Sequence, residues 1–87
     1  MIVRTAVVAL LLSSGSAIAA PPCTSEPKSK WLSEADFRAK IADRGYRYKN
    51  IKIAGSCYEI YGRNKDGKRV EVYFNPITAA VVEEHKS

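Results

Sequence analysis

The hydrophobic pattern of the chain changes from one unbroken apolar run to a short helical period and then to strand-like alternation. Residues 6–12 are continuously apolar. Phe37 and Ile41, spaced four apart in a polar stretch, predict one buried stripe on a helix. From Tyr46 onward apolar and polar residues alternate, which is typical of a sheet with one buried face. This order of elements predicts an α+β domain.

The predicted helix has start and stop signals on both sides. Ser33 is a good N-cap residue, and Leu32 and Phe37 have the spacing of a hydrophobic staple. Gly45 stands where a left-handed residue commonly ends a helix. We therefore predict a helix over residues 34–44.

Three β segments follow the helix and cover residues 46–54, 57–63 and 68–75. In the first segment the parity of the apolar positions slips at residues 49–50, which predicts a bulge or bend there. Pro76 cannot donate a ladder hydrogen bond and ends the third segment. After Pro76 we expect a turn and a short edge strand at 80–82, with frayed residues from 83 to 87.

The register of the hairpin between the second and third segments follows from their apolar residues. Residues directly opposite each other in an antiparallel pair point to the same face. The apolar residues of both segments are even-numbered, so paired positions must sum to an even number. A three-residue loop at 65–67 satisfies this and places Gly67 at its left-handed position, whereas a two-residue turn would expose one strand's apolar residues. The predicted core consists of Phe37, Ile41, Ile53, Ile60, Val72 and Phe74.

The N-terminus has the three parts of a secretory signal peptide. A short region with one cation, Arg4, precedes the apolar run, and small residues after it end in an A-x-A pattern at 17–19. A retained membrane anchor needs about 20 apolar residues, more than this run supplies. We predict a signal peptide at 1–19, cleaved after Ala19, and a secreted or periplasmic product with no stable membrane insertion. The remaining parts are a lead-in at 20–30, a domain at 31–83 and a tail at 84–87.

Removal of the signal peptide leaves a small basic domain. Arg4 is lost with it, so 13 Lys and Arg remain against 9 Asp and Glu, a net charge of +4. Because the cations are interspersed with acids and the product is exported, we expect no nucleic-acid partner. An even cysteine count in a small exported domain predicts a disulfide between Cys23 and Cys57. The one histidine, His85, stands in a polar stretch without a ligand set, so we expect no metal and no cofactor.

Several short motifs follow one another along the mature chain. Gly-Tyr at 45–46 follows the helix, Cys-Tyr-Glu-Ile-Tyr-Gly occupies 57–62, and Asp-Gly-Lys-Arg-Val-Glu-Val-Tyr-Phe occupies 66–74. In this order and spacing, the segment from Trp31 to Val82 resembles the PepSY family, in particular its small secreted single-domain members. Asn-Pro-Ile-Thr at 75–78 is similar to that family's Asp-Pro-x-Thr-Gly turn, with Ala79 in place of the glycine.

The resemblance implies one helix packed on a three- to four-stranded antiparallel sheet. In that family the domain occurs in propeptides of secreted metallopeptidases and in cell-envelope proteins, and it is associated with the regulation or inhibition of peptidases. It brings no catalytic or cofactor residues. We predict a non-catalytic module, not an enzyme, that binds a protein or peptide, with an envelope protein or a peptidase as partner. The alternative is an envelope protein that binds a small ligand or a metal.

The candidate binding residues lie on the non-core side of the predicted hairpin. There Glu59 faces Tyr73, and Tyr61 faces Glu71. Paired carboxylates can serve acid–base chemistry, but that needs a cleft, and we interpret these as cross-strand pairs on a solvent face. Tyr and Arg are enriched at interface hot spots. An ordinary polar face, or one partly covered by the N-terminal segment through Trp31, is the alternative. The candidate residues are Glu59, Tyr61, Arg63, Arg69 and Tyr73.

Overall fold

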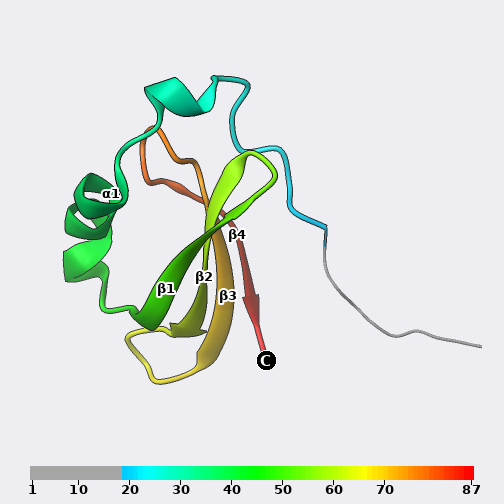
Figure 1. Ribbon diagram of the computed structural model, residues 1–87. Helices are drawn as coiled ribbons and strands as arrows, with labels where there is room; N and C mark the ends of the chain where they lie inside the picture. The colour runs from blue at the N-terminus through cyan, green and yellow to red at the C-terminus, as the bar shows by residue number, and fades with distance from the viewer. Residues whose placement is uncertain (1–18) are drawn as a thin grey trace, which may run out of the picture.

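The computed structural model describes residues 19–87, and the predicted signal peptide up to residue 18 lies outside them. In these residues one α-helix packs against a four-stranded antiparallel sheet with the strand order β1-β2-β3-β4 (Figure 1), which confirms the predicted α+β fold. No helix in this part of the chain is long and apolar enough to cross a membrane. The elements are η1 (Lys28–Lys30), α1 (Glu34–Ile41), η2 (Ala42–Arg44), β1 (Arg47–Ala54), β2 (Cys57–Arg63), β3 (Arg69–Phe74) and β4 (Val81–Lys86).

The helix begins and ends where the sequence predicts. The Ser33 hydroxyl accepts a hydrogen bond of 3.1 Å from the backbone N–H of Asp36, which satisfies one orphan donor of the first turn. After Ile41 the last turn tightens into the 3₁₀ turn η2, and Gly45 ends it in the left-handed region at φ 85°. The Arg44 guanidinium then donates 2.6 Å to the carbonyl oxygen of Ala79, which joins the helix end to the turn after β3.

The core lies between α1 and one face of the sheet. The Phe37 ring of α1 sits 4.8 Å from the Tyr58 ring and 5.0 Å from the Phe74 ring, centroid to centroid. Tyr58 remains buried because its hydroxyl donates 2.6 Å to the carbonyl oxygen of Leu32, just before the helix. Trp31 packs edge-on against Tyr58 at 5.3 Å and seals this end of the core. The buried cluster consists of Phe37, Ile41, Ile51, Tyr58, Ile60, Val70, Val72, Phe74 and Ala79.

The predicted register of the central hairpin is confirmed. Tyr58 pairs with Phe74 and Ile60 with Val72, so the even-numbered residues of β2 and β3 share the core face. The loop closes through a 2.9 Å hydrogen bond from the N–H of Asn64 to the carbonyl oxygen of Lys68, with Gly67 at φ 81°. The predicted irregularity in β1 is also present, since its register with β2 shifts between residues 48 and 51.

The prediction that Ile53 is a core residue is wrong, because its side chain is 54% exposed. Its partner in the register is Tyr58, so it points to the same side of the sheet as the core. However, β1 is an edge strand with a neighbour on one side only, and Ile51 joins the buried cluster with Phe37 instead. Alternation therefore predicted the face of Ile53 correctly but not its depth.

The prediction that residues 83–87 fray, and that 84–87 form a tail, is wrong in this structure. The strand β4 extends through Lys86, which pairs with Val70, and the N–H of Ser87 still donates 3.2 Å to the carbonyl oxygen of Arg69. Without β4 the outer backbone groups of β3 would have no strand partner. Because an edge strand can keep most side chains in water, the sequence indicated only the start of β4, as the edge strand expected at 80–82.

Candidate binding face

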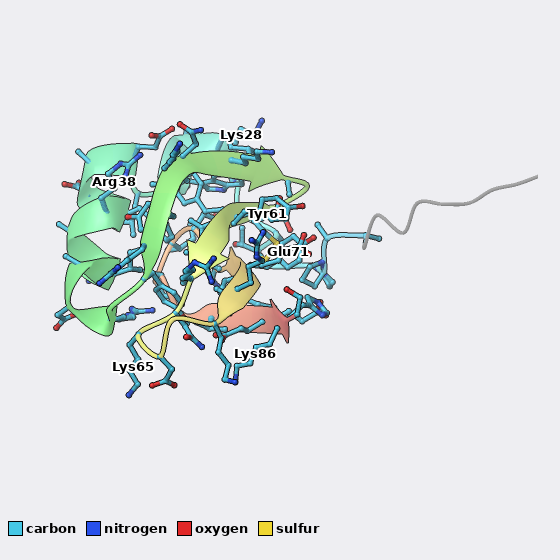
Figure 2. The ribbon with its side chains drawn as sticks, turned by 90° about the horizontal axis from the view of Figure 1, so that it is seen from below. Lys28, Arg38, Tyr61, Lys65, Glu71 and Lys86 are labelled. Carbon is cyan, nitrogen blue, oxygen red and sulfur yellow. A yellow bond between two sulfur atoms is a disulfide. The ribbon has the colours of Figure 1, made fainter. Side chains whose placement is uncertain are left out.

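The face of the sheet turned away from α1 is called the open face here. Figure 2 shows Tyr61 and Glu71 on this side of the ribbon, with Arg38 of α1 on the other. The strand register arranges its residues in three parallel rows. From the hairpin loop inward, the rows are Arg47–Arg63–Arg69, then Tyr61–Glu71–His85, then Lys52–Glu59–Tyr73–Glu83.

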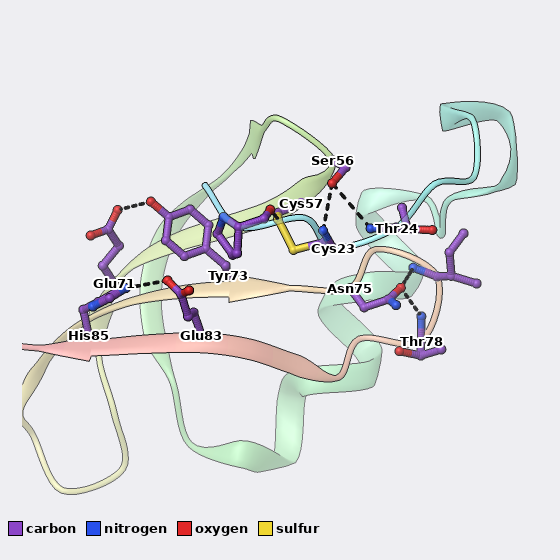
Figure 3. The surroundings of a disulfide bond; sticks show 12 residues. Cys23, Thr24, Ser56, Cys57, Glu71, Tyr73, Asn75, Thr78, Glu83 and His85 are labelled. Atoms are coloured by element: carbon purple, nitrogen blue, oxygen red, sulfur yellow. Dashed lines mark hydrogen bonds and ion pairs between the residues drawn. A yellow bond between two sulfur atoms is a disulfide. The ribbon is translucent and has the colours of Figure 1, made fainter. Parts of the chain in front are cut away.

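The lead-in covers the end of the open face farthest from the hairpin loop. Cys23 and Cys57 form the predicted disulfide, with their Cα atoms 5.2 Å apart. The Ser56 hydroxyl accepts a hydrogen bond of 2.8 Å from the N–H of Cys23, which fixes the lead-in beside the start of β2 (Figure 3). Ala20 packs against the buried cluster of Cys23, Cys57 and Tyr73.

This cover changes the predicted binding patch. Tyr73 is only 2% exposed and Glu59 only 5%, so the prediction that both lie on a solvent face is wrong. The anticipated alternative of partial cover by the N-terminal segment is present, but the contact runs through Cys23. Trp31 instead packs on Tyr58 on the core side. Arg63 and Arg69 are exposed, and Tyr61 is 54% exposed, so these three residues remain accessible.

A carboxyl–tyrosine cluster joins the covered and exposed halves of the open face. Glu71 Oε2 accepts hydrogen bonds from the hydroxyls of Tyr61 and Tyr73, at 2.9 Å and 2.7 Å. The carboxyl groups of Glu59 and Glu71 also share a hydrogen bond. Tyr61 is thereby anchored at its hydroxyl although more than half of its surface faces solvent.

The pKa values of the two carboxyl groups are shifted in opposite directions. Burial, and then the hydrogen bond with Glu71, raises the pKa of Glu59. The hydrogen bond with Glu59 lowers the pKa of Glu71, and the two tyrosine hydroxyls lower it further. The two shifts have opposite directions, so Glu59 keeps its proton to a higher pH than Glu71 does. Glu59 Oε2 is buried and has no hydrogen-bond partner among residues 19–87, which also disfavours a charge on that group.

The tyrosines of the cluster act only as donors at ordinary pH. The hydrogen bond to Glu71 raises the pKa of Tyr61 to about 12. Burial, followed by the same acceptor, raises the pKa of Tyr73. On the outer side of Tyr61, the Lys52 ammonium lies 5.1 Å from the ring centroid in a cation–π arrangement.

Two shallow hollows lie on either side of Tyr61 at the uncovered end of the open face. The first lies over β1 and β2, and the second extends across β3 to the end of β4. Both are lined by Lys49, Tyr61, Gly62 and Arg63. Gly62 permits the close approach of β1 and β2, since a Cβ at this position would collide with the carbonyl oxygen of Arg47.

Sequence reasoning missed Arg47 and Lys49 as members of this surface. The bulge in β1 shifts the alternation of the strand, so counting alternate residues does not assign these two residues to the correct face of the sheet. Arg47 lies before the bulge and pairs with Arg63, and this pairing places Arg47 on the open face. His85 was assigned to a polar tail, but it lies in β4 with its Nε2 atom 2.8 Å from Glu83 Oε1.

Residues 19–87 contain no group of three or more His, Cys, Asp or Glu side chains that could hold a metal ion. A family model described as peptidase propeptide and YPEB domain, PepSY_2, matches residues 3–85, nearly the whole chain. No curated protein and no solved structure matches the chain.

Proposed function

Because the chain belongs to the PepSY family of peptidase propeptide and YPEB domains, we propose that it is a non-catalytic extracytoplasmic module that binds a protein or peptide and modulates a peptidase. PepSY domains are generally non-catalytic propeptide or inhibitor modules and are typically extracytoplasmic. Fold alone does not assign a function, so the proposal also needs a site on this chain.

The observation that carries the proposal is the uncovered end of the open face around Tyr61. The ring is 54% exposed, its hydroxyl is held by Glu71, and a hollow lies on each side of it. An anchored tyrosine offers a large contact area and loses little conformational freedom on binding. With Arg63 beside it, the surface has the residue types that dominate interface energetics.

The covered end of the face supports the same use. The disulfide and the lead-in pack over the end that contains Tyr73, and the uncovered end is built on the paired strands β2 and β3, which hold its side chains in place. A rigid, partly flat surface suits a protein or an extended peptide better than a small molecule, which binds in a deeper pocket. A structural disulfide also fits the oxidising compartment to which the predicted signal peptide at 1–19 would send the chain.

A peptidase assay tests this function. The purified exported protein is added to metallopeptidases secreted by the same cells, and peptide hydrolysis is measured with increasing amounts of the protein. We expect a saturable change in rate that Tyr61→Ala weakens by about thirtyfold or more, since hot-spot residues contribute about 2 kcal/mol or more.

Ile53→Ala is the matched control, because Ile53 is also 54% exposed but lies on the helix side of the sheet. It should leave the effect on the peptidase unchanged. Equal losses in the Tyr61 and Ile53 variants would contradict a site on the open face. No effect of the wild-type protein on any secreted peptidase would contradict the peptidase role.

A further inference from the structure

The uncovered end of the open face carries three arginines, one on each of three neighbouring strands. The register places Arg47 directly opposite Arg63, and Arg63 directly opposite Arg69. Opposite residues of antiparallel strands point to the same face, so the three side chains stand side by side. All three residues are exposed. We call Arg47, Arg63 and Arg69 the arginine row.

No arginine of the row forms an ion pair within the described part of the protein. Between residues 19 and 87, the ion pairs join Arg38 to Glu34 and His85 to Glu83, and neither involves the row. Like charges placed directly opposite one another destabilise a sheet. Three arginines in one row therefore lower the stability of the domain, and a bound anion would relieve that repulsion.

The surroundings of the row add further positive charge. Lys49 lines both hollows, Lys52 lines the first, and Lys86 lines the second. Glu71 also lines the second hollow, and its carboxylate, which accepts the hydroxyls of Tyr61 and Tyr73, is the acidic side chain there. A ligand in the first hollow thus meets cations and one aromatic ring, and a ligand in the second meets the same ring, cations and the Glu71 carboxylate.

We propose that the arginine row binds the carboxylates of an acidic, extended peptide segment in the protein partner. The proposal rests on the proposed function, because it names the chemistry of the partner that binds at the same face. A guanidinium matches a carboxylate as a two-pronged donor, so each arginine can hold one acidic side chain. Arg63 is already oriented by a 2.9 Å hydrogen bond to the carbonyl oxygen of Gly67.

The dimensions of the row suit alternate acidic residues. Neighbouring strands are about 4.8 Å apart, so a row across three strands spans about 10 Å. In an extended segment, side chains on one face recur every two residues, or about 6.6–6.8 Å. Acids at alternate positions can therefore reach different arginines as the segment crosses the strands. A single phosphate group is too small to contact the whole row.

Binding of synthetic peptides to the purified exported protein tests the proposal. One peptide is extended and has glutamate at alternate positions, and its counterpart has glutamine at the same positions. We expect the glutamate peptide to bind, the glutamine peptide to bind at least about tenfold more weakly, and the triple variant Arg47→Gln, Arg63→Gln, Arg69→Gln to lose at least about tenfold in affinity. Affinity should also fall with added salt.

The matched control removes the same charge elsewhere, with Lys28, Lys30 and Lys40 each changed to Gln. These three lysines are exposed and lie on η1 and α1, outside both hollows. The control variant should bind the glutamate peptide within about twofold of wild type, since net charge alone contributes mainly to steering. Equal losses in both triple variants would reduce the effect to net charge and overturn the proposal.

Two further probes separate the peptide from other anions. Tighter binding to vesicles rich in phosphatidylglycerol, or to a single-stranded oligonucleotide, than to the glutamate peptide would overturn the proposal. The peptidase assay keeps the two ideas distinct. If the arginine-row variant still modulates the peptidase while Tyr61→Ala does not, the proposed function stands and the acidic-segment inference fails.

Discussion

Glu59 and Glu71 share a hydrogen bond between their carboxyl groups across β2 and β3. Burial raises the pKa of Glu59, and the hydrogen bond with Glu59 lowers the pKa of Glu71. Several titratable groups face the pair. Lys52 stands opposite Glu59 on β1, and His85 stands opposite Glu71 on β4. The hydroxyls of Tyr61 and Tyr73 and the carboxyl group of Glu83 complete the set. The pair thus links the pH of the surroundings to the stability of the open face.

The two carboxyl groups should give opposite slopes of stability with pH. The folded protein keeps a proton on Glu59 that the unfolded chain releases, so stability falls as the pH rises above the ordinary value of 4.5 and through the raised pKa. For Glu71 the pKa is lowered, so stability falls as the pH drops below 4.5. Glu59→Gln removes the first slope and should make the protein more stable than wild type at about pH 7. Urea denaturation across this pH range measures both effects.

The control for this prediction is Glu26→Gln, which removes an exposed carboxylate from the lead-in. Its stability curve should run parallel to that of the wild type. If the curve of Glu59→Gln runs parallel as well, the two carboxyl groups do not share a proton in the folded protein.

The disulfide should supply a large part of the stability of so small a domain. Cys23 and Cys57 are 34 residues apart, and closing a loop of this length removes about 3–4 kcal/mol of entropy from the unfolded chain in the loop-closure model. Cys57→Ser should therefore melt far below the wild type, and reductant should destabilise the wild type but not the double Cys→Ser variant. Calorimetry measures the melting temperature. Titratable thiols in the native protein would show that the bridge is absent in solution.

The core prediction compares a buried residue with an exposed one on the same side of the sheet. Phe74 is fully buried against Phe37 and Tyr46, so Phe74→Ala should lower the free energy of unfolding by about 3–5 kcal/mol. Ile53 is 54% exposed, so Ile53→Ala should cost less than about 1 kcal/mol. Urea denaturation of both variants checks the ratio. Similar losses would mean that Ile53 is buried in solution.

The elements with a clear apolar period could be predicted from the sequence. The helix at 34–44 has a cap and a stop, and β2 and β3 alternate strictly, so their register followed from parity. The sequence predicted only the start of β4, as a short edge strand at 80–82, because the charged residues that follow have no apolar period. Its pairing depends on the exposed backbone of β3, which is a property of the assembled sheet.

The candidate site could be predicted only in part. Parity assigns each strand residue to a face of the sheet, but it does not show whether another segment covers that face. Parity placed Tyr61 and Tyr73 on one face, yet only Tyr61 is accessible. A usable signal was present, since Cys57 has the same parity as Glu59 within β2, and a disulfide to Cys57 had to bring the lead-in onto that face. How much of the face the lead-in covers depends on the packing of Ala20, which no local sequence pattern predicts.

The arginine row should lower the stability of the free protein in a way that salt can reveal. Arg69 stands directly opposite Arg63, and like charges in that position cost about 0.2–1 kcal/mol. Arg69→Gln should therefore raise the free energy of unfolding at low ionic strength. The gain should shrink near 1 M salt, where charges are screened beyond about 3 Å. Lys30→Gln, an exposed change outside the sheet, is the control and should show no such gain. A loss of stability in Arg69→Gln at low salt would mean that the arginines do not repel one another across the strands.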